Sequence, residues 1–188
     1  MRPLTALMGQ FRFSVRSILM AALILVPMIC LIVWLGFNNY QHELESRRQG
    51  VKSQVETATG LLTWAHQREV SGELSREQAQ TVARQAMAQL RYEGVEYFWI
   101  NDLNHQMVMH PIKPELDGKD VSGLKDPNGT MIFQAFVQKV KSSGSGFVDY
   151  QWPRQGSEKP VDKTSFVQGF APWGWVVGSG VYIDKVLE

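Results

Sequence analysis

The feature that most constrains this chain is an uninterrupted apolar segment near its N-terminus. It spans residues 18–37 and reads ILMAALILVPMICLIVWLGF, with no charged residue. Because an α-helix rises about 1.5 Å per residue, a run of this length crosses a bilayer core about 30 Å thick. Pro27 lies within the segment, and membrane helices tolerate an internal proline better than soluble helices do. We therefore expect one transmembrane helix here.

Two other interpretations of this segment fit the sequence less well. A cleaved signal peptide has a shorter apolar region followed by small residues at a cleavage site, whereas residues 37–45 read FNNYQHELE. The buried helix of a soluble protein is rarely apolar on every side over such a length. The sequence favours an uncleaved membrane anchor.

The charges that flank the segment predict its orientation. Three arginines precede it without any acidic residue, whereas Glu43 and Glu45 follow it. The positive-inside rule places the arginine-rich side in the cytoplasm. We expect residues 1–17 in the cytoplasm, residues 18–37 in the membrane, and residues 38–188 outside the cytoplasm as one domain.

The remaining composition excludes several partners and chemistries. The formal net charge is +1, which gives no reason to expect a nucleic-acid partner. The only cysteine, Cys30, lies in the apolar segment, so neither an intrachain disulfide nor a CxxC site is expected. The histidines and glycines match no zinc, phosphate-loop or serine-hydrolase motif. We expect no catalysis, no cofactor and no metal.

Residues 38–71 are predicted to form a long amphipathic helix. Its apolar residues recur at helical spacing and form one stripe: Leu44, Val51, Val55, Ala58, Leu62 and Ala65. Spacing alone leaves open whether the stripe faces the chain's own domain, a partner helix, or both. Its heptad-like intervals are compatible with a homodimer.

Beyond Gly72 the sequence alternates between helix, strand and turn patterns. A second helix is predicted from Ser75, with Gln78 as its capping-box partner, and its inner face comprises Ala79, Val82, Ala86 and Leu90. Strands are predicted at 96–101, 106–110, 146–152, 162–170 and 174–183, with a long loop at 111–129 and a short helix at 130–141. Because the links are short, pairing should be mostly antiparallel. The sequence predicts an α+β domain with a five-stranded antiparallel sheet, preceded by one transmembrane helix.

Five short motifs carry a family resemblance. They are Tyr97-Phe-Trp-Ile-Asn-Asp102, Met109-His-Pro111, Gly118-Lys-Asp120, Tyr150-Gln-Trp-Pro153 and Pro172-Trp-Gly-Trp-Val-Val-Gly178. In this order they resemble the single Cache sensor domains of methyl-accepting chemotaxis receptors and some sensor kinases, from about residue 40 to residue 184. The resemblance implies a PAS-like fold, in which a long N-terminal helix lies across the sheet, and a role in extracytoplasmic sensing. An alternative stays open: a non-catalytic, membrane-anchored interaction module that dimerises with other receptors.

Strand alternation suggests a ligand site, because every second side chain shares a face of the sheet. The residues that would converge are Tyr97, Trp99, Tyr150, Trp152 and Lys163. They would form an aromatic box around one cation, with His110 as a further donor. Aromatic walls cover a short carbon chain, and the polar groups bind a carboxylate, so this box suits a small organic acid.

Two further residues are candidates for this site. Arg91 is expected to be a second clamp on the carboxylate, and Met109 lies next to His110. Each candidate also has an ordinary structural interpretation, as a core aromatic, a solvated cation or a turn residue. The resemblance implies a short carboxylate such as acetate, propionate, pyruvate or malate as the ligand.

Overall fold

The computed structural model describes residues 13–183, and the side chains of residues 17–183. It divides into two compact units, Met1–Glu43 and Leu44–Glu188. Helix α2 (Phe13–Val70) contributes its first part to the first unit and the rest to the second. The predicted cytoplasmic segment, residues 1–17, falls mostly outside the described residues.

The apolar segment is helical, as predicted. Within the described residues, α2 is the one helix that is long and apolar enough to cross a membrane. Large apolar side chains along residues 18–37, such as Ile24 at 68% and Val33 at 65%, are exposed. This segment is therefore not the buried helix of a soluble core.

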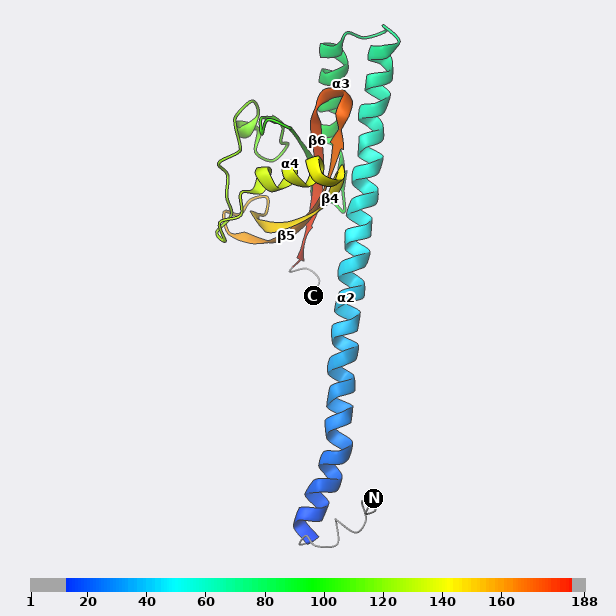
Figure 1. The fold of residues 1–188 in the computed structure, drawn as a ribbon, viewed down its shortest axis with the longest axis vertical. Helices are drawn as coiled ribbons and strands as arrows, with labels where there is room; N and C mark the ends of the chain where they lie inside the picture. The colour runs from blue at the N-terminus through cyan, green and yellow to red at the C-terminus, as the bar shows by residue number, and fades with distance from the viewer. Residues whose placement is uncertain (1–12, 184–188) are drawn as a thin grey trace. The chain divides into compact units, whose positions relative to one another are not determined.

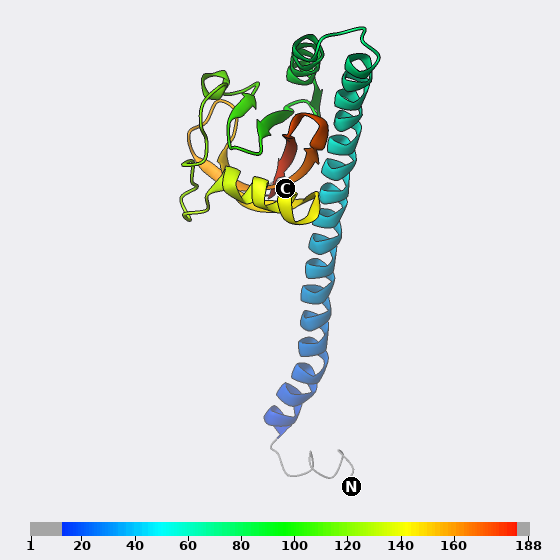
Figure 2. The same ribbon diagram turned by 45° about the horizontal axis from the view of Figure 1, so that its top comes forward.

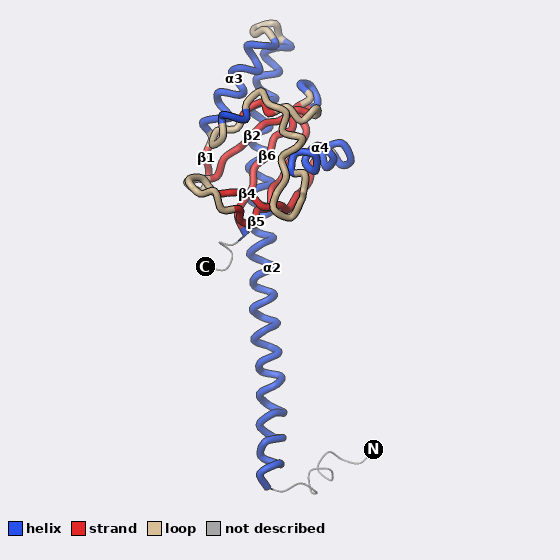
Figure 3. The backbone as a smooth tube through the Cα atoms, turned by 90° about the vertical axis from the view of Figure 1, so that its left-hand side faces the viewer, coloured by secondary structure: helices blue, strands red, loops and turns tan. Residues whose placement is uncertain are grey.

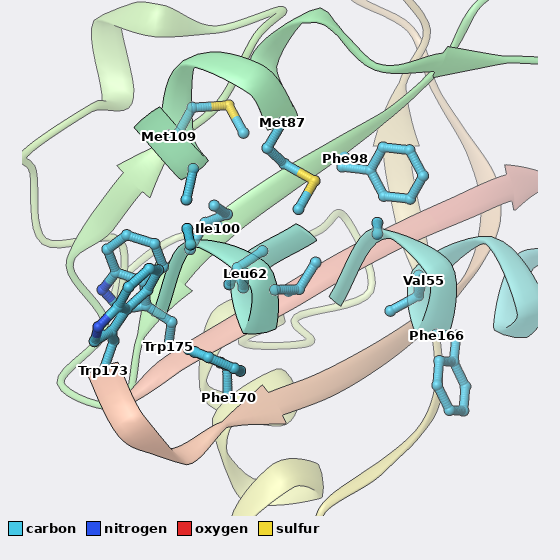
Figure 4. Packing of buried hydrophobic residues seen from close by; sticks show 14 of the residues in the cluster. Val55, Leu62, Met87, Phe98, Ile100, Met109, Phe166, Phe170, Trp173 and Trp175 are labelled. Atoms are coloured by element: carbon cyan, nitrogen blue, oxygen red, sulfur yellow. The ribbon is translucent and has the colours of Figure 1, made fainter. Parts of the chain in front are cut away.

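The second unit begins with the amphipathic part of α2. Five residues of the predicted stripe are each at most 3% exposed: Val51, Val55, Ala58, Leu62 and Ala65. Figure 4 shows Val55 and Leu62 among buried side chains that include Phe98. These five residues face the chain's own domain, whereas Leu44, the first residue of the stripe, is half-buried.

Helix α3 (Arg76–Gln89) follows and begins with the predicted capping box. The Ser75 Oγ accepts from the Gln78 backbone N–H at 3.2 Å, and the Gln78 Oε1 accepts from the Ser75 N–H at 2.8 Å. The predicted inner face was only partly right. The buried residues are Ala79, Ala83 and Met87, whereas Leu90 caps the C-terminus and is 38% exposed.

The strands form one antiparallel sheet, with the order β1-β2-β6-β5-β4 and with β3 also paired to β2. They are β1 (Arg91–Tyr92), β2 (Glu96–Asp102), β3 (Met107–Met109), β4 (Ser145–Pro153), β5 (Pro160–Phe170) and β6 (Trp175–Tyr182). The sheet is thus six-stranded, and the prediction of five strands was wrong. The additional strand, β1, is two residues long, which is too short to show a strand period.

Short helical segments complete the chain: η1 (Pro114–Leu116), α4 (Ile132–Ser143) and η2 (Ala171–Trp173). Helices α2 and α3 cover one face of the sheet, and α4 covers the other, as Figures 1 and 2 show. In Figure 3, α4 and the loops lie in front of the strands. Each face carries its own buried cluster, which we call the α2 core and the α4 core. The arrangement is the predicted α+β fold with a long helix across an antiparallel sheet.

Candidate ligand-binding site

The site forms on the α4 face of the sheet, where strand alternation brings β2 and β4 side chains together. Tyr97 and Trp99 of β2 and Tyr150 of β4 all belong to the α4 core. Strand β6 lies between β2 and β5. It has glycines at positions where a larger side chain would collide with neighbouring residues. A Cβ at Gly178 would lie 2.2 Å from the Trp99 Cζ2, so glycine is required for the indole to pack against this strand as it does.

These side chains enclose a small cavity, which we call the inner cavity. Its lining residues are Tyr97, Trp99, His110, Ile132, Phe133, Phe136, Tyr150 and Trp152. Its volume is about 10 Å³, which is about the space that one water molecule occupies. Ring centroids around it are close, at 5.1 Å for Tyr97–His110 and 5.2 Å for Phe136–Tyr150. An organic acid that enters must displace at least one of these rings.

Lys163 of β5 lies beside this cavity and is 1% exposed. Its Nζ is 4.5 Å from the ring centroid of Tyr97 and 4.6 Å from that of Tyr182, and it donates to the Tyr97 Oη at 3.4 Å. Burial lowers the pKa of Lys163 to about 8, although the Glu96 carboxylate opposes this shift. The ammonium is therefore mostly charged at neutral pH, held between two phenol rings by cation–π attraction.

His110 is a neutral hydrogen-bond donor. Its Nδ1 accepts from the Lys113 backbone N–H at 3.0 Å, so we assign the ring proton to Nε2. Its own backbone N–H donates to the Asp117 Oδ1 at 2.7 Å, which fixes the loop that carries it. Burial, followed by the charges of Lys163 and Lys113, lowers the pKa of His110 to about 3.

The tyrosine hydroxyls stay protonated. Burial raises the pKa of Tyr97 and of Tyr150 above the ordinary tyrosine value. The Tyr150 Oη is 3.0 Å from the Ser165 Oγ, which fixes the direction of that phenol. Together with His110, these hydroxyls give the site several hydrogen-bond donors, and the Lys163 ammonium is its cation, a set of groups that matches a single carboxylate.

The structure brings most of the predicted site residues together, but not all of them. Tyr97, Trp99, His110, Tyr150 and Trp152 line one cavity, and Lys163 adjoins it. Arg91 is exposed and donates to the backbone carbonyls of Ala88 and Leu90 at 2.9 and 2.7 Å. Met109 belongs to the α2 core on the opposite face, as Figure 4 shows.

Sequence reasoning missed some lining residues. Helix α4 contributes Ile132, Phe133 and Phe136, and the apolar period of that helix was the only signal for them. Tyr182 contacts Lys163 from β6, and alternation from Gly178 along that strand would have placed it on this face. Within the part of the chain that the structure describes, no cluster of His, Cys, Asp or Glu suits a metal ion.

A long helix across an antiparallel sheet, with an aromatic and cationic cluster on the other face, is the arrangement of a PAS-like sensor domain. Residues 44–188 match the family model of single Cache domain 2, and the chain belongs to that family. Single Cache domains of chemoreceptors are non-catalytic ligand-binding domains.

Two known proteins share extensive sequence with this chain. Methyl-accepting chemotaxis protein McpP of Pseudomonas putida is 43% identical over 172 residues, which cover 87% of this chain and 31% of McpP. Sensor histidine kinase MctS of Rhizobium johnstonii is 32% identical over 101 residues, 54% of this chain and 22% of MctS. The chain thus spans less than a third of the length of these curated relatives.

Two solved structures share the fold. One is a periplasmic sensor domain of a chemotaxis protein, with a TM-score of 0.74 and 53% identity over 75% of this chain and 98% of that domain. The other is a Cache chemosensory domain, studied for its recognition of carboxylic acids, with a TM-score of 0.74 and 46% identity. The match covers 77% of this chain and 98% of that one.

Proposed function

We propose that this chain senses a short carboxylate outside the cytoplasm and passes the signal across the membrane. The observation that carries the proposal is the enclosed aromatic cavity with a charged lysine and a neutral histidine at its edge. Aromatic walls would cover a short carbon chain, while Lys163, the His110 Nε2 and the tyrosine hydroxyls would bind the carboxylate. Acetate, propionate, pyruvate and malate are the acids we propose to test first.

The small volume of the inner cavity supports a sensing role. A ligand shifts a conformational equilibrium only if it binds one state better than the other. Because the cavity of about 10 Å³ cannot hold an organic acid unless its walls move, binding and a change of shape are coupled. A rigid pocket that already fitted its ligand would provide no such coupling.

A direct contact links the site to α2. Asp149 neighbours Tyr150 on β4, and the Nη2 of Arg48 in α2 donates to both of its carboxylate oxygens at 3.0 Å. The Arg48 guanidinium also lies 5.4 Å from the Phe147 ring centroid on the same strand. We propose that displacement of β4 by ligand moves α2 through this contact, with shifts of about 1–2 Å as in other switching helices.

The membrane arrangement that we propose is that of a receptor. Residues 18–37 would span the inner membrane, with the N-terminus in the cytoplasm and the Cache domain in the periplasm, following the flanking charges. The relatives that the chain matches are membrane chemoreceptors and kinases, and chemoreceptors commonly dimerise. We propose a homodimer for this chain. The alternative, an interaction module that dimerises with other receptors, would need the same kind of second surface as a homodimer, because residues 51–65 of the apolar stripe are buried in their own domain.

Calorimetry of the full chain in lipid nanodiscs tests the proposal. We expect at least one of the four acids to give saturable binding, and Lys163→Met to weaken it at least tenfold. The matched control is Lys119→Met, because that lysine is exposed and does not line the inner cavity, and the affinity of this variant should equal that of the unmodified chain. If none of the acids binds, or if both variants bind as the unmodified chain does, the proposed function is wrong.

A further inference from the structure

A second, larger cavity adjoins the site. Its volume is about 180 Å³, and we call it the outer cavity. Its lining residues are Val95, Glu96, Tyr97, Arg154, Gln155 and Tyr182. Unlike the inner cavity, it has room for a small organic acid without any movement of its walls.

Tyr97 is the one lining residue that both cavities share. The two phenol rings that hold the Lys163 ammonium, at 4.5 and 4.6 Å, are those of Tyr97 and Tyr182, and both rings line the outer cavity. A small rotation of the Tyr97 side chain would therefore expose the buried ammonium to a molecule in the outer cavity and open the inner cavity at the same time.

The charges around the outer cavity suit one incoming anion. Arg154 and Lys163 carry two formal positive charges, and Glu96, which is 3% exposed, carries one negative charge. The Arg154 guanidinium lies 4.3 Å from the Tyr182 ring centroid, and this side chain is only half-buried, so it faces solvent as well as the cavity. A monocarboxylate that enters here meets Arg154 first and balances the surplus charge when it reaches Lys163.

The other conceivable entrance passes Trp152, the one half-buried residue that lines the inner cavity. A cation lies over Trp152 as well, since the Lys113 Nζ is 5.2 Å from the centroid of its ring. However, hydrogen bonds from Lys113 to His110 and from His110 to Asp117 brace the loop on this side, at 3.0 and 2.7 Å. Moving this loop aside would break both, whereas rotation of Tyr97 gives up a long hydrogen bond, of 3.4 Å from the Lys163 Nζ.

We infer that the outer cavity is the entry site for the carboxylate, with Arg154 as its first contact and Tyr97 as the movable wall between the two cavities. This inference rests on the proposed function. It adds a second anion-binding position, occupied on the way in, and it assigns to Arg154 a role in the rate of association rather than in the final complex.

Stopped-flow measurement of propionate binding tests the inference, with the full chain in nanodiscs of zwitterionic lipid. Tryptophan fluorescence reports arrival, because Trp99 and Trp152 line the inner cavity. The variants are Arg154→Gln and its matched control Lys113→Gln, each of which removes one half-buried cation at one of the two entrances. A charge at the rim of a site changes the association rate and its dependence on salt more than it changes dissociation.

We expect Arg154→Gln to slow association by roughly three- to tenfold and to flatten its dependence on ionic strength, with dissociation changed less than about twofold. Lys113→Gln should leave association within about twofold of that of the unmodified chain. The inference is overturned if Lys113→Gln slows association more than Arg154→Gln does, if both variants slow it equally, or if neither changes it. The proposed function would stand in each of these cases. If none of the four acids changes the fluorescence of the unmodified chain and none binds it in calorimetry, the proposed function itself fails.

Discussion

One tight steric constraint in the site is at Gly178, and the change Gly178→Ala tests it directly. The new Cβ would lie 2.2, 2.6 and 2.7 Å from three atoms of the Trp99 indole. Carbon atoms pack best at about 3.5–4.0 Å, so the indole has to move away by at least about 1.3 Å. On its far side Trp99 meets Phe136, with ring centroids 5.2 Å apart, and the adjoining cavity offers only about 10 Å³.

Because the indole has so little room, the cost should lie in the upper part of the range for overpacked cores, about 2–3 kcal/mol. For a domain of this size that corresponds to a fall of about 4–12 °C in the midpoint of thermal unfolding. The displaced indole would also fill the inner cavity, so we expect propionate binding to be lost. Thermal unfolding followed by near-ultraviolet circular dichroism, together with calorimetry of the full chain, measures both effects.

The matched control is Gly60→Ala, the same substitution on the exposed side of α2, where a Cβ meets nothing within 4 Å. It should raise stability by about 0.5–1 kcal/mol, because alanine favours a helix. In a Trp99→Phe background, which lacks the outer indole atoms Cζ2 and Cη2 that the new Cβ meets, the cost of Gly178→Ala should fall below about 1 kcal/mol. A Gly178→Ala variant as stable as the unmodified chain, or a cost that is the same in both backgrounds, would refute the steric argument.

Two further predictions concern Lys163 and the contact between Arg48 and Asp149. The pKa of Lys163 is lowered to about 8 in the folded chain, from 10.5, so the unfolded chain binds more protons between these values and stability should rise from pH 8 toward pH 10. Over the same range the affinity for propionate should fall by up to about tenfold per pH unit, because the ammonium loses its charge. Calorimetric unfolding measures the stability, and the variant Lys163→Met should not show its rise with pH. Asp149→Asn should change the free energy of unfolding by less than about 1 kcal/mol, because the pair is partly exposed, at 27% and 60% of the side chains. It should nevertheless remove the effect of propionate on amide hydrogen exchange in residues 44–55 of α2, and an unchanged ligand effect would contradict the proposed route to that helix.

Features that depend on local sequence were predicted well. The capping box at Ser75 and Gln78 forms as expected, because both of its hydrogen bonds join residues three positions apart. The pairing of Tyr97 with Trp99, and of Tyr150 with Trp152, on shared faces follows from strand alternation alone. That the two pairs meet depends on the sheet order, which the sequence suggested only through the family resemblance.

Features that depend on register or on competing local bonds were not predictable in the same way. Met109 is paired with Ile100, and directly opposite residues share a face, so its side chain lies with Ile100 in the α2 core. No pattern in residues 106–110 fixes that register. Arg91 follows the last turn of α3, where the helix-terminal carbonyls attract its guanidinium more directly than the site does.

The bond from the Lys113 backbone N–H to the His110 Nδ1 has a consequence for the form of the ligand that the proposed site would accept. It leaves Nε2 as the place of the ring proton, so the imidazole offers a donor to the cavity without carrying a charge. Burial lowers the pKa of His110 to about 3 and that of Lys163 to about 8, so between these values neither side chain should change its dominant form. In mildly acidic medium, any pH dependence of binding should therefore come from the acid itself, because only its ionised form is attracted to the ammonium.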